Sequence, residues 1–175
     1  MKKTFPFYKQ PDSKDCGPTC LRIVAKHYGK LITLQKIREV SETTREGSNL
    51  LKLSDAAEAI GFKTIGVKLE FNKLKEAPLP LIVHWNKNHF AVVYKIKKNE
   101  VFISDPAYGL IKYSITDFIN HWIGNNADEN TKEGVALLLE TTPKFKEQNW
   151  EETDKTSVKF LFSYFFKHKS LIIQL

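Results

Sequence analysis

Apolar residues in the first third of the chain recur at helical intervals. After Cys16, four of them fall at i, i+3, i+4 and i+7, on one face of a helix: Leu21, Val24, Ala25 and Tyr28. Gly29 follows, where a left-handed C-terminal cap would lie, and Asp15 and Pro18 suit the first turn. Thr33 and Asn49 can each cap the start of a further helix. The pattern therefore predicts helices over residues 16–28, 33–41 and 49–60.

The periodicity changes after Gly61. Short segments rich in β-branched and aromatic residues are separated by turn residues. They predict strands over residues 62–69, 80–85, 89–97, 100–105, 110–113 and 134–140. Ser114 and Asp117 predict a capping box that opens a short helix through Trp122. Because short turns join neighbouring strands antiparallel, we predict an α+β fold with a helical part and a largely antiparallel sheet.

Length and composition fit a soluble globular protein. The chain has 175 residues, 42% hydrophobic and 27% charged, which suffices for one domain with a core and an appendage. Lysines near the N-terminus are not followed by an apolar stretch, so no secretory signal is predicted and we expect a reducing cytosol. Two cysteines are too few for a disulfide scaffold. The net charge of +7 comes mostly from scattered lysines without a nucleic-acid motif, so we expect no nucleic-acid partner.

The C-terminal region differs from the rest of the chain. Residues 143–157 are charged and lack periodicity, so we predict a linker there and a globular domain over residues 1–142. Residues 158–175 predict a separate amphipathic helix. No run of residues reaches the roughly 18 apolar positions that a membrane-spanning helix requires.

Cys16 is the first candidate for chemistry. A cysteine in the first turn of a helix feels the positive end of the helix dipole, which favours the reactive thiolate over the thiol. An arbitrary cysteine is more often a small buried hydrophobe, but the polar loop before Cys16 favours a nucleophile. Cys20, one turn further along, is predicted to be a packing residue.

A nucleophilic thiol needs a base, and the chain has five histidines. Three of them, in predicted helices or the tail, are expected to be structural or exposed: His27, His121 and His168. His89 opens a predicted strand at a sheet edge, whereas His84 lies inside the apolar stretch PLIVHW, where a hydrogen-bonded core histidine is expected. Chemistry favours His89 but leaves both open, because either imidazole titrates in the useful range.

Two more residues could complete an acyl-transfer site. Asp105 ends a predicted strand and can orient an imidazole, although Asp before Pro also commonly begins a turn. Asp12 and Asp15 are alternatives, but helix caps explain them. Gln10 lies six residues before the cysteine, and its amide could help to hold the oxyanion, although a loop glutamine is usually only solvated.

Cofactor chemistry fits poorly. Cys16 and Cys20 lie on one helix face, but no second pair of ligands completes a zinc site. Residues 61–68 have the glycine spacing of a phosphate-binding loop, but Val67 occupies the position of its lysine. A dinucleotide fingerprint is absent from the sequence as well. We therefore expect no metal, ATP or nicotinamide within this chain.

Several short motifs occur together, from about Phe5 to Thr142. They are Gln10, Asp15-Cys16-Gly17-Pro18, Tyr28-Gly29-Lys30, Gly47-Ser48, Ala56-Ala57-Glu58, Gly61-Phe62, Leu79-Pro80, His84-Trp85, Asn88-His89-Phe90 and Asp105-Pro106-Ala107. In order and spacing they resemble the peptidase domain of bacteriocin-processing, peptidase-containing ABC transporters. The likeness is specific because many motifs agree at once. It departs from the family at residues 123–133, which lengthen the connection after Trp122.

The resemblance implies a papain-like fold, in which a helical subdomain carries the nucleophile and a β-rich subdomain carries histidine and aspartate. It implies that Cys16 attacks a peptide carbonyl and that His89 acts first as base and then as acid. Asp105 would orient the imidazole, and Gln10 would contribute to the oxyanion hole. The implied substrate is a precursor peptide that is cut after a double-glycine leader, whose amphipathic helix docks in an apolar groove.

The same resemblance implies a larger protein. In this family a membrane domain and an ATP-binding domain follow the peptidase domain, so residues 158–175 would lead into a truncated first transmembrane segment. The full-length protein would be a homodimer with its peptidase at the cytoplasmic face of the membrane. Two alternatives stay open: a non-catalytic module that only binds leaders, and a papain-like amidase or acyltransferase.

Overall fold

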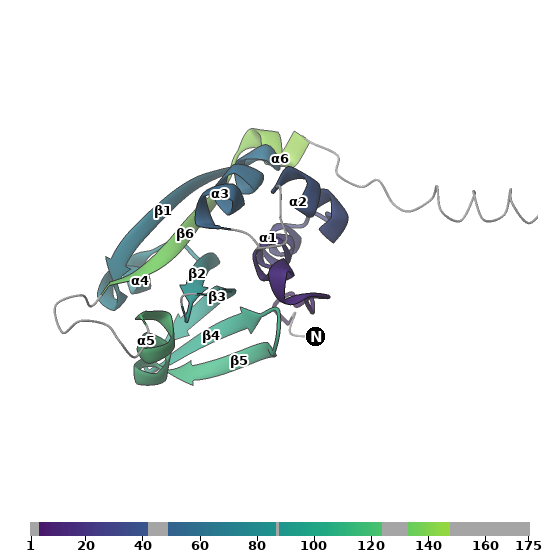
Figure 1. The fold of residues 1–175 in the computed structure, drawn as a ribbon. Helices are drawn as coiled ribbons and strands as arrows, with labels where there is room; N and C mark the ends of the chain where they lie inside the picture. The colour runs from purple at the N-terminus through teal and green to yellow at the C-terminus, as the bar shows by residue number, and fades with distance from the viewer. Residues whose placement is uncertain (1–3, 42–48, 87, 124–132, 148–175) are drawn as a thin grey trace, which may run out of the picture.

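The structure is a computed structural model of the chain, and it describes residues 4–41, 49–86, 88–123 and 133–147. At its centre lies a six-stranded sheet with helices around it (Figure 1). Neighbouring strands all pair antiparallel, in the order β1-β6-β2-β3-β4-β5. The predicted α+β class with a largely antiparallel sheet is confirmed.

Every helix and strand predicted within the described residues is present, with its ends shifted by at most one residue. The helices are α1 (Cys16–His27), α2 (Leu34–Val40), α3 (Leu50–Ala59), α4 (Phe71–Glu76), α5 (Ile115–Ile123) and α6 (Pro143–Glu147), with a 3₁₀ helix η1 (Ser13–Asp15) before α1. The strands are β1 (Phe62–Glu70), β2 (Leu81–Trp85), β3 (His89–Lys97), β4 (Glu100–Asp105), β5 (Gly109–Ser114) and β6 (Glu133–Thr141).

Local caps explain where the predicted helices begin and end. Thr33 and Asn49 each accept the backbone N–H three residues on, at 3.2 and 2.8 Å. Ser114 accepts the equivalent bond at the start of α5, at 3.1 Å. Gly29 takes a φ of 91° directly after the last turn of α1, in the left-handed region that favours glycine.

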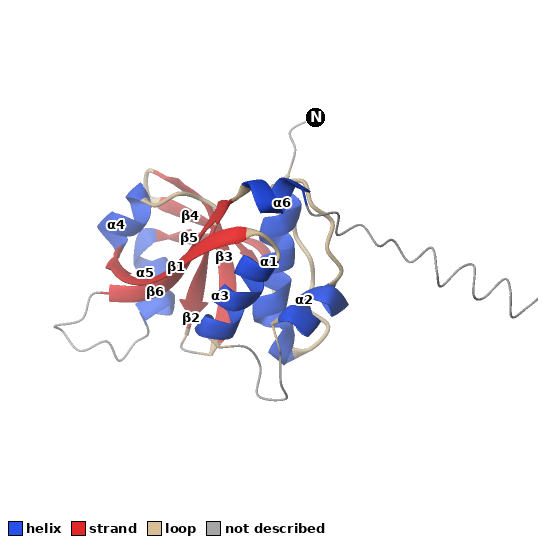
Figure 2. Ribbon diagram, turned by 90° about the horizontal axis from the view of Figure 1, so that it is seen from above, coloured by secondary structure: helices blue, strands red, loops and turns tan. Residues whose placement is uncertain are grey.

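The sheet separates two apolar cores. Consecutive residues of β2 and β3 point alternately to its two faces, so that Ile82 and Val92 enter one core while Val83 and Val93 enter the other. The first core contains residues of α1, α2 and α3, and the second contains residues of α4 and α5. Figure 2 shows these two groups of helices on opposite sides of the sheet. Burial on both faces explains why these strands are continuous apolar runs.

The sequence pattern misses two short helices. α4 has only six residues, too few for a clear periodicity, and buries Phe71 and Leu74. α6 occupies the start of the predicted linker, where Phe145 is buried with its ring centroid 4.5 Å from that of Phe62. The globular part therefore extends at least to Glu147, beyond the predicted boundary.

Gly61 allows this last helix to approach the end of α3. Its φ is 97°, and a Cβ at this position would lie 2.5 Å from the backbone nitrogen of Phe145. The backbone N–H and the hydroxyl of Thr142 both donate to the Gly61 carbonyl, at 3.2 and 2.6 Å. Such close backbone packing requires a residue without a side chain.

Several predictions fall outside the described residues. They concern the Gly47-Ser48 motif, most of the 123–133 insertion, the rest of the 143–157 linker and the 158–175 helix. Among the residues that are described, no helix is both long and apolar enough to cross a bilayer.

Candidate active site

Cys16 is the first residue of α1 and is 6% exposed. Cys20, one turn further on, is completely buried in the core that α1 shares with the sheet. Burial raises the pKa of the Cys20 thiol well above its usual value, with smaller contributions from Cys16 and Asp105. Cys20 therefore stays protonated and packs in the core, as predicted.

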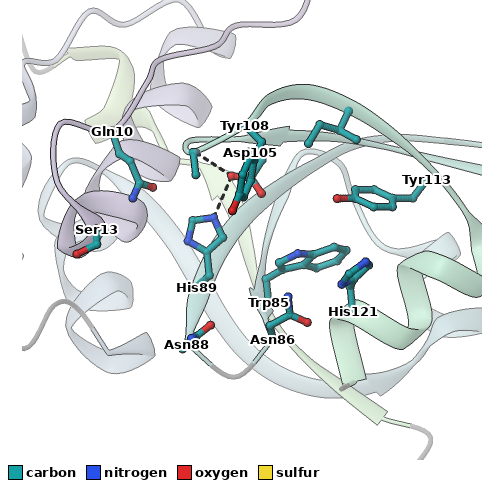
Figure 3. Close-up of a pocket in the computed structure, with 12 residues that line it drawn as sticks. Gln10, Ser13, Trp85, Asn86, Asn88, His89, Asp105, Tyr108, Tyr113 and His121 are labelled. Carbon is teal, nitrogen blue, oxygen red and sulfur yellow. Dashed lines mark hydrogen bonds and ion pairs between the residues drawn. The ribbon is translucent and has the colours of Figure 1, made fainter. Parts of the chain in front are cut away.

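His89 and Asp105 lie beside each other on neighbouring strands. His89 begins β3 and Asp105 ends β4, and antiparallel pairing places these two strand ends together. The His89 Nε2–H donates to Asp105 Oδ1 at 2.9 Å (Figure 3). The backbone N–H of Ala107 donates to the same oxygen at 2.8 Å. Both side chains are largely buried, with 17% of His89 and 3% of Asp105 exposed, so solvent screens the pair little.

The surroundings of His89 favour its protonated form. Burial by itself lowers the pKa of an imidazole, but hydrogen bonds with Asp105 and Cys16 outweigh it and raise the pKa of His89 to about 9. The Cys16 thiol therefore lies near the imidazole that the carboxylate holds. A helix and two strands bring together three of the residues singled out in the sequence.

His84 has different surroundings. It lies inside β2, half-buried, with its ring centroid 5.1 Å from that of Phe90. Burial lowers the pKa of His84, and the charge of His89 adds to this effect. Within the described part of the chain, no hydrogen bond joins His84 to a carboxylate. The structure thus separates two histidines that the sequence left as alternatives, and it favours His89.

Gln10 is held near this group by the N-terminal segment. Its backbone N–H donates to the Pro106 carbonyl at 2.9 Å, and the Ser104 hydroxyl donates to the Pro6 carbonyl at 3.0 Å. These bonds fasten the segment across the end of β4, and the Gln10 side chain points towards His89 (Figure 3). Its buried Oε1 has no hydrogen-bond partner among the described residues, so the amide is placed but unpaired.

Asp15 does not cap α1 with its side chain, contrary to the sequence-based interpretation. It is 3% exposed, and its carboxylate receives two bonds from Arg38, from Nε at 2.7 Å and from Nη2. The backbone N–H of Asp12 also donates to it, at 3.2 Å. Arg38 lies on α2, so this pair ties α2 to the loop directly before Cys16. Asp12 caps the short η1 with its side chain, and the bond from its backbone N–H to Asp15 completes the capping box of η1.

A hollow of about 590 Å³ opens beside His89 and Asp105. Gln10 and Ser13 line its end near η1. Away from η1 it is lined by Trp85, Asn86, Asn88, Ala107, Tyr108, Ile111, Tyr113 and His121. The sequence does not indicate this wall, because its residues come from several elements and share no local motif. His121 is exposed, as predicted, but it also lines the hollow.

The structure pairs an imidazole with a carboxylate at 2.9 Å, and a thiol lies near enough to influence the imidazole. These three groups are the ones that nucleophilic acyl transfer uses. In the described ranges, no group of three or more His, Cys, Asp and Glu side chains is arranged to hold a metal ion.

Comparison with known sequences gives consistent results. Residues 4–127 match the sequence profile of the Peptidase C39 family. The lactococcin-G-processing and transport ATP-binding protein LagD of Lactococcus lactis subsp. lactis is 35% identical over 170 residues, which cover 94% of this chain and 22% of LagD. The colicin V secretion/processing ATP-binding protein CvaB of Escherichia coli is 29% identical over 123 residues, 70% of this chain and 18% of CvaB. The chain thus spans about a fifth of the length of these relatives.

Solved structures show the same likeness. A double-glycine-motif protease from an AMS/PCAT transporter, crystallised with the leader peptide, has a TM-score of 0.70 and 31% identity, covering 79% of this chain and 93% of that chain. The peptidase domain of Streptococcus ComA, a bifunctional ABC transporter, has a TM-score of 0.69 and 28% identity, covering 79% of this chain and all of that one.

Proposed function

The chain belongs to the Peptidase C39 family, and from that premise we propose that it is a cysteine endopeptidase with Cys16 as nucleophile, His89 as base and acid, and Asp105 as orienting group. One observation supports this assignment: the imidazole of His89 is hydrogen-bonded to Asp105 at 2.9 Å, and Cys16 is near enough to contribute to its raised pKa. With Nε2 bonded to Asp105, Nδ1 remains to exchange a proton with Cys16.

In the proposed reaction His89 starts as the imidazolium, since its pKa is raised to about 9, and Cys16 attacks as the thiolate, the nucleophilic form of a cysteine. Cys16 Sγ attacks the peptide carbonyl carbon, and a tetrahedral oxyanion forms. His89 gives its proton to the amide nitrogen, the C–N bond breaks, and a thioester stays on Cys16. Water then attacks the thioester while His89 accepts its proton. The acid leaves and the starting pair is restored.

Gln10 supports the oxyanion in this mechanism. Its side chain is already placed beside His89 and has no partner for its Oε1 among the described residues. The amide can turn about its last torsion and present an N–H, together with the backbone N–H of Cys16 at the start of α1. Removing one such donor typically costs about 2.7–4 kcal/mol of activation free energy.

For the substrate we propose a precursor peptide cut after a double-glycine leader. The support comes from the relatives: one matching structure is a double-glycine-motif protease with its leader peptide, and the matching sequences are processing and transport proteins. We further propose that the chain works as part of a homodimeric transporter at the cytoplasmic face of a membrane. The transporter's membrane and nucleotide-binding domains would be its partners and the latter would take ATP. The peptidase step uses no cofactor and no nucleic acid.

The test is cleavage of a synthetic leader peptide with a Gly-Gly boundary, followed by mass spectrometry of the products. Cys16→Ala should abolish cleavage, whereas Cys20→Ala should leave it within about twofold of wild type, because Cys20 is buried and protonated. Alkylation of the wild type at neutral pH should label Cys16 before Cys20, and His89→Ala should slow this labelling.

The same experiment separates the two alternatives. A leader peptide that binds wild type but is never cut would indicate a binding module. Products with an intact backbone and a modified side-chain amide would indicate an amidase or acyltransferase. Cleavage that survives in Cys16→Ala would contradict the assignment of the nucleophile.

A further inference from the structure

We propose that the hollow beside His89 binds the side chain of the first substrate residue after the cut, and that it favours an apolar or aromatic residue there. The hollow can have this role only if the chain is the peptidase proposed above. The leader lies on the other side of the scissile bond. The preference therefore concerns the peptide that follows the leader and leaves with the new amino terminus.

The position of the hollow relative to the chemistry indicates which side of the bond it serves. His89 must give its proton to the leaving amine, so the residue that carries this amine has to lie against the imidazole. His89 and Asp105 both line the hollow, whereas Cys16 does not. Gln10 and Ser13, close to Cys16 in the chain, line one end of the hollow, and His89 lies between that end and the rings of Trp85 and His121 (Figure 3). A peptide that leaves past His89 therefore enters the part of the hollow that the rings line.

Three rings in mutual contact form the wall of the hollow. The centroid of Trp85 lies 5.5 Å from that of Tyr113 and 5.3 Å from that of His121, and Tyr113 and His121 are 5.4 Å apart. Figure 3 shows them gathered on one side of His89. The Asn86 N–H donates to the His121 carbonyl at 2.9 Å, which fastens α5 to the end of β2. The wall is thus preformed rather than assembled by the substrate.

The lining determines the class of side chain. Ile111 adds an aliphatic surface to the rings, and Tyr108, 80% exposed, extends the apolar surface at the rim. Aromatic faces bind other rings and alkyl groups through offset or edge contacts. A carboxylate placed against these ring faces would lose its hydration, which disfavours acidic residues there. A glycine would leave the wall unused.

Substrate peptides provide the first test. They share one leader and the Gly-Gly boundary and differ only in the next residue, which is Phe, Leu, Gly or Asp. We expect kcat/KM of the wild type to be about tenfold higher for Phe and Leu than for Gly and Asp, the usual effect of filling or missing an apolar pocket. Equal values across the four peptides would overturn the proposal.

A pair of variants on β5 provides the second test. Ile111→Trp fills the hollow, so it should lower kcat/KM for the Phe peptide about tenfold and for the Gly peptide less than about twofold. Leu110→Trp makes a comparable change at the next residue, which is 44% exposed and does not line the hollow, and should change neither value. An equal loss on both peptides in Ile111→Trp, with thermal unfolding as for wild type, would contradict the assignment.

The outcomes distinguish this proposal from the one on which it depends. If wild type cuts none of the four peptides while binding the leader, the peptidase function fails and the hollow loses its proposed role with it. If all four are cut after Gly-Gly at one rate, the peptidase function stands and only the preference is wrong. Should Ile111→Trp not fold, the wild-type series alone decides.

Discussion

The helical half and the sheet half of the molecule each bury one carboxylate beside the candidate nucleophile. Asp15 precedes Cys16 in the helical half, Asp105 ends β4 in the sheet half, and both residues are almost completely buried. Each carboxylate has a nitrogen partner from another element: Arg38 of α2 for Asp15, and His89 of β3 for Asp105. In both halves the pair fixes a segment against the site.

The partner decides what each pair can do. A guanidinium stays charged at every physiological pH, so Arg38 can hold the loop before Cys16 but cannot exchange a proton. The imidazole of His89 can lose and regain a proton while Asp105 keeps its orientation. A buried carboxylate therefore marks an organised segment, and only the titratable partner makes it a candidate for chemistry.

The largest effect expected from this comparison is on catalysis in the sheet half. His89→Ala removes the group that moves the proton and should lower kcat/KM on a Gly-Gly leader peptide by at least about 10³-fold. His84→Ala, in the same hairpin but without a carboxylate partner among the described residues, should lower it no more than about threefold. Steady-state kinetics of the two variants checks this. Equal losses would mean that the two histidines share the role.

The sequence predicts the helical half well because its information is local. The periodicity after Cys16 and the caps at Thr33 and Asn49 each act within one or two turns, and the structure reproduces all three helices. The start of α1 was therefore predicted together with the candidate nucleophile. The bond from Arg38 to Asp15 was not predicted, because nothing near either residue indicates which helix will lie against the loop.

The sheet half depends on pairing between distant residues. The strands themselves were predicted, but the choice between His89 and His84 required the register that sets one beside Asp105. Predicting the ring wall of the hollow would require the packing of three elements, since Trp85, Tyr113 and His121 meet only after β2, β5 and α5 have packed. Helix α6 was missed for a similar reason: its one buried ring finds its place on the distant β1.

A smaller effect is expected on stability in the helical half. Arg38→Ala leaves the Asp15 carboxylate buried with its main partner gone, and should lower the free energy of unfolding by about 2 kcal/mol, a moderate value because the Arg38 side chain is 42% exposed. Lys73→Ala breaks the ion pair with Glu76, in which both side chains are about 70% exposed. This variant should change the free energy of unfolding by less than about 0.5 kcal/mol.

Urea unfolding followed by tryptophan fluorescence measures both variants. A stability of Arg38→Ala equal to that of Lys73→Ala would show that Asp15 gains nothing from its partner. In that case the parallel between the two carboxylates would no longer hold. The stability of Arg38→Lys should lie between those of Arg38→Ala and Lys73→Ala, since lysine keeps the charge but cannot donate two fixed bonds.

The smallest effect is the pH dependence that only the sheet-half pair should produce. The pKa of His89 is about 9 in the folded protein and about 6.5 in the unfolded chain. Between these values the folded state binds more protons, so stability is complete below pH 6.5 and is lost as the pH rises through 9. We expect a decrease of about 1 kcal/mol between pH 7.5 and 8.5.

The two carboxylates can be compared directly in this range. Asp105→Asn removes a partner that raises the pKa of His89, so its unfolding free energy should decline less steeply between pH 6.5 and 8.5. Arg38→Ala should keep the wild-type slope at a lower stability, because the arginine does not titrate there. His27 and His84 do not interfere, since burial lowers their pKa values and their effect lies at lower pH. A wild-type slope in Asp105→Asn would mean that this carboxylate does not control the protonation of His89, and its proposed role as orienting group would lose its electrostatic basis.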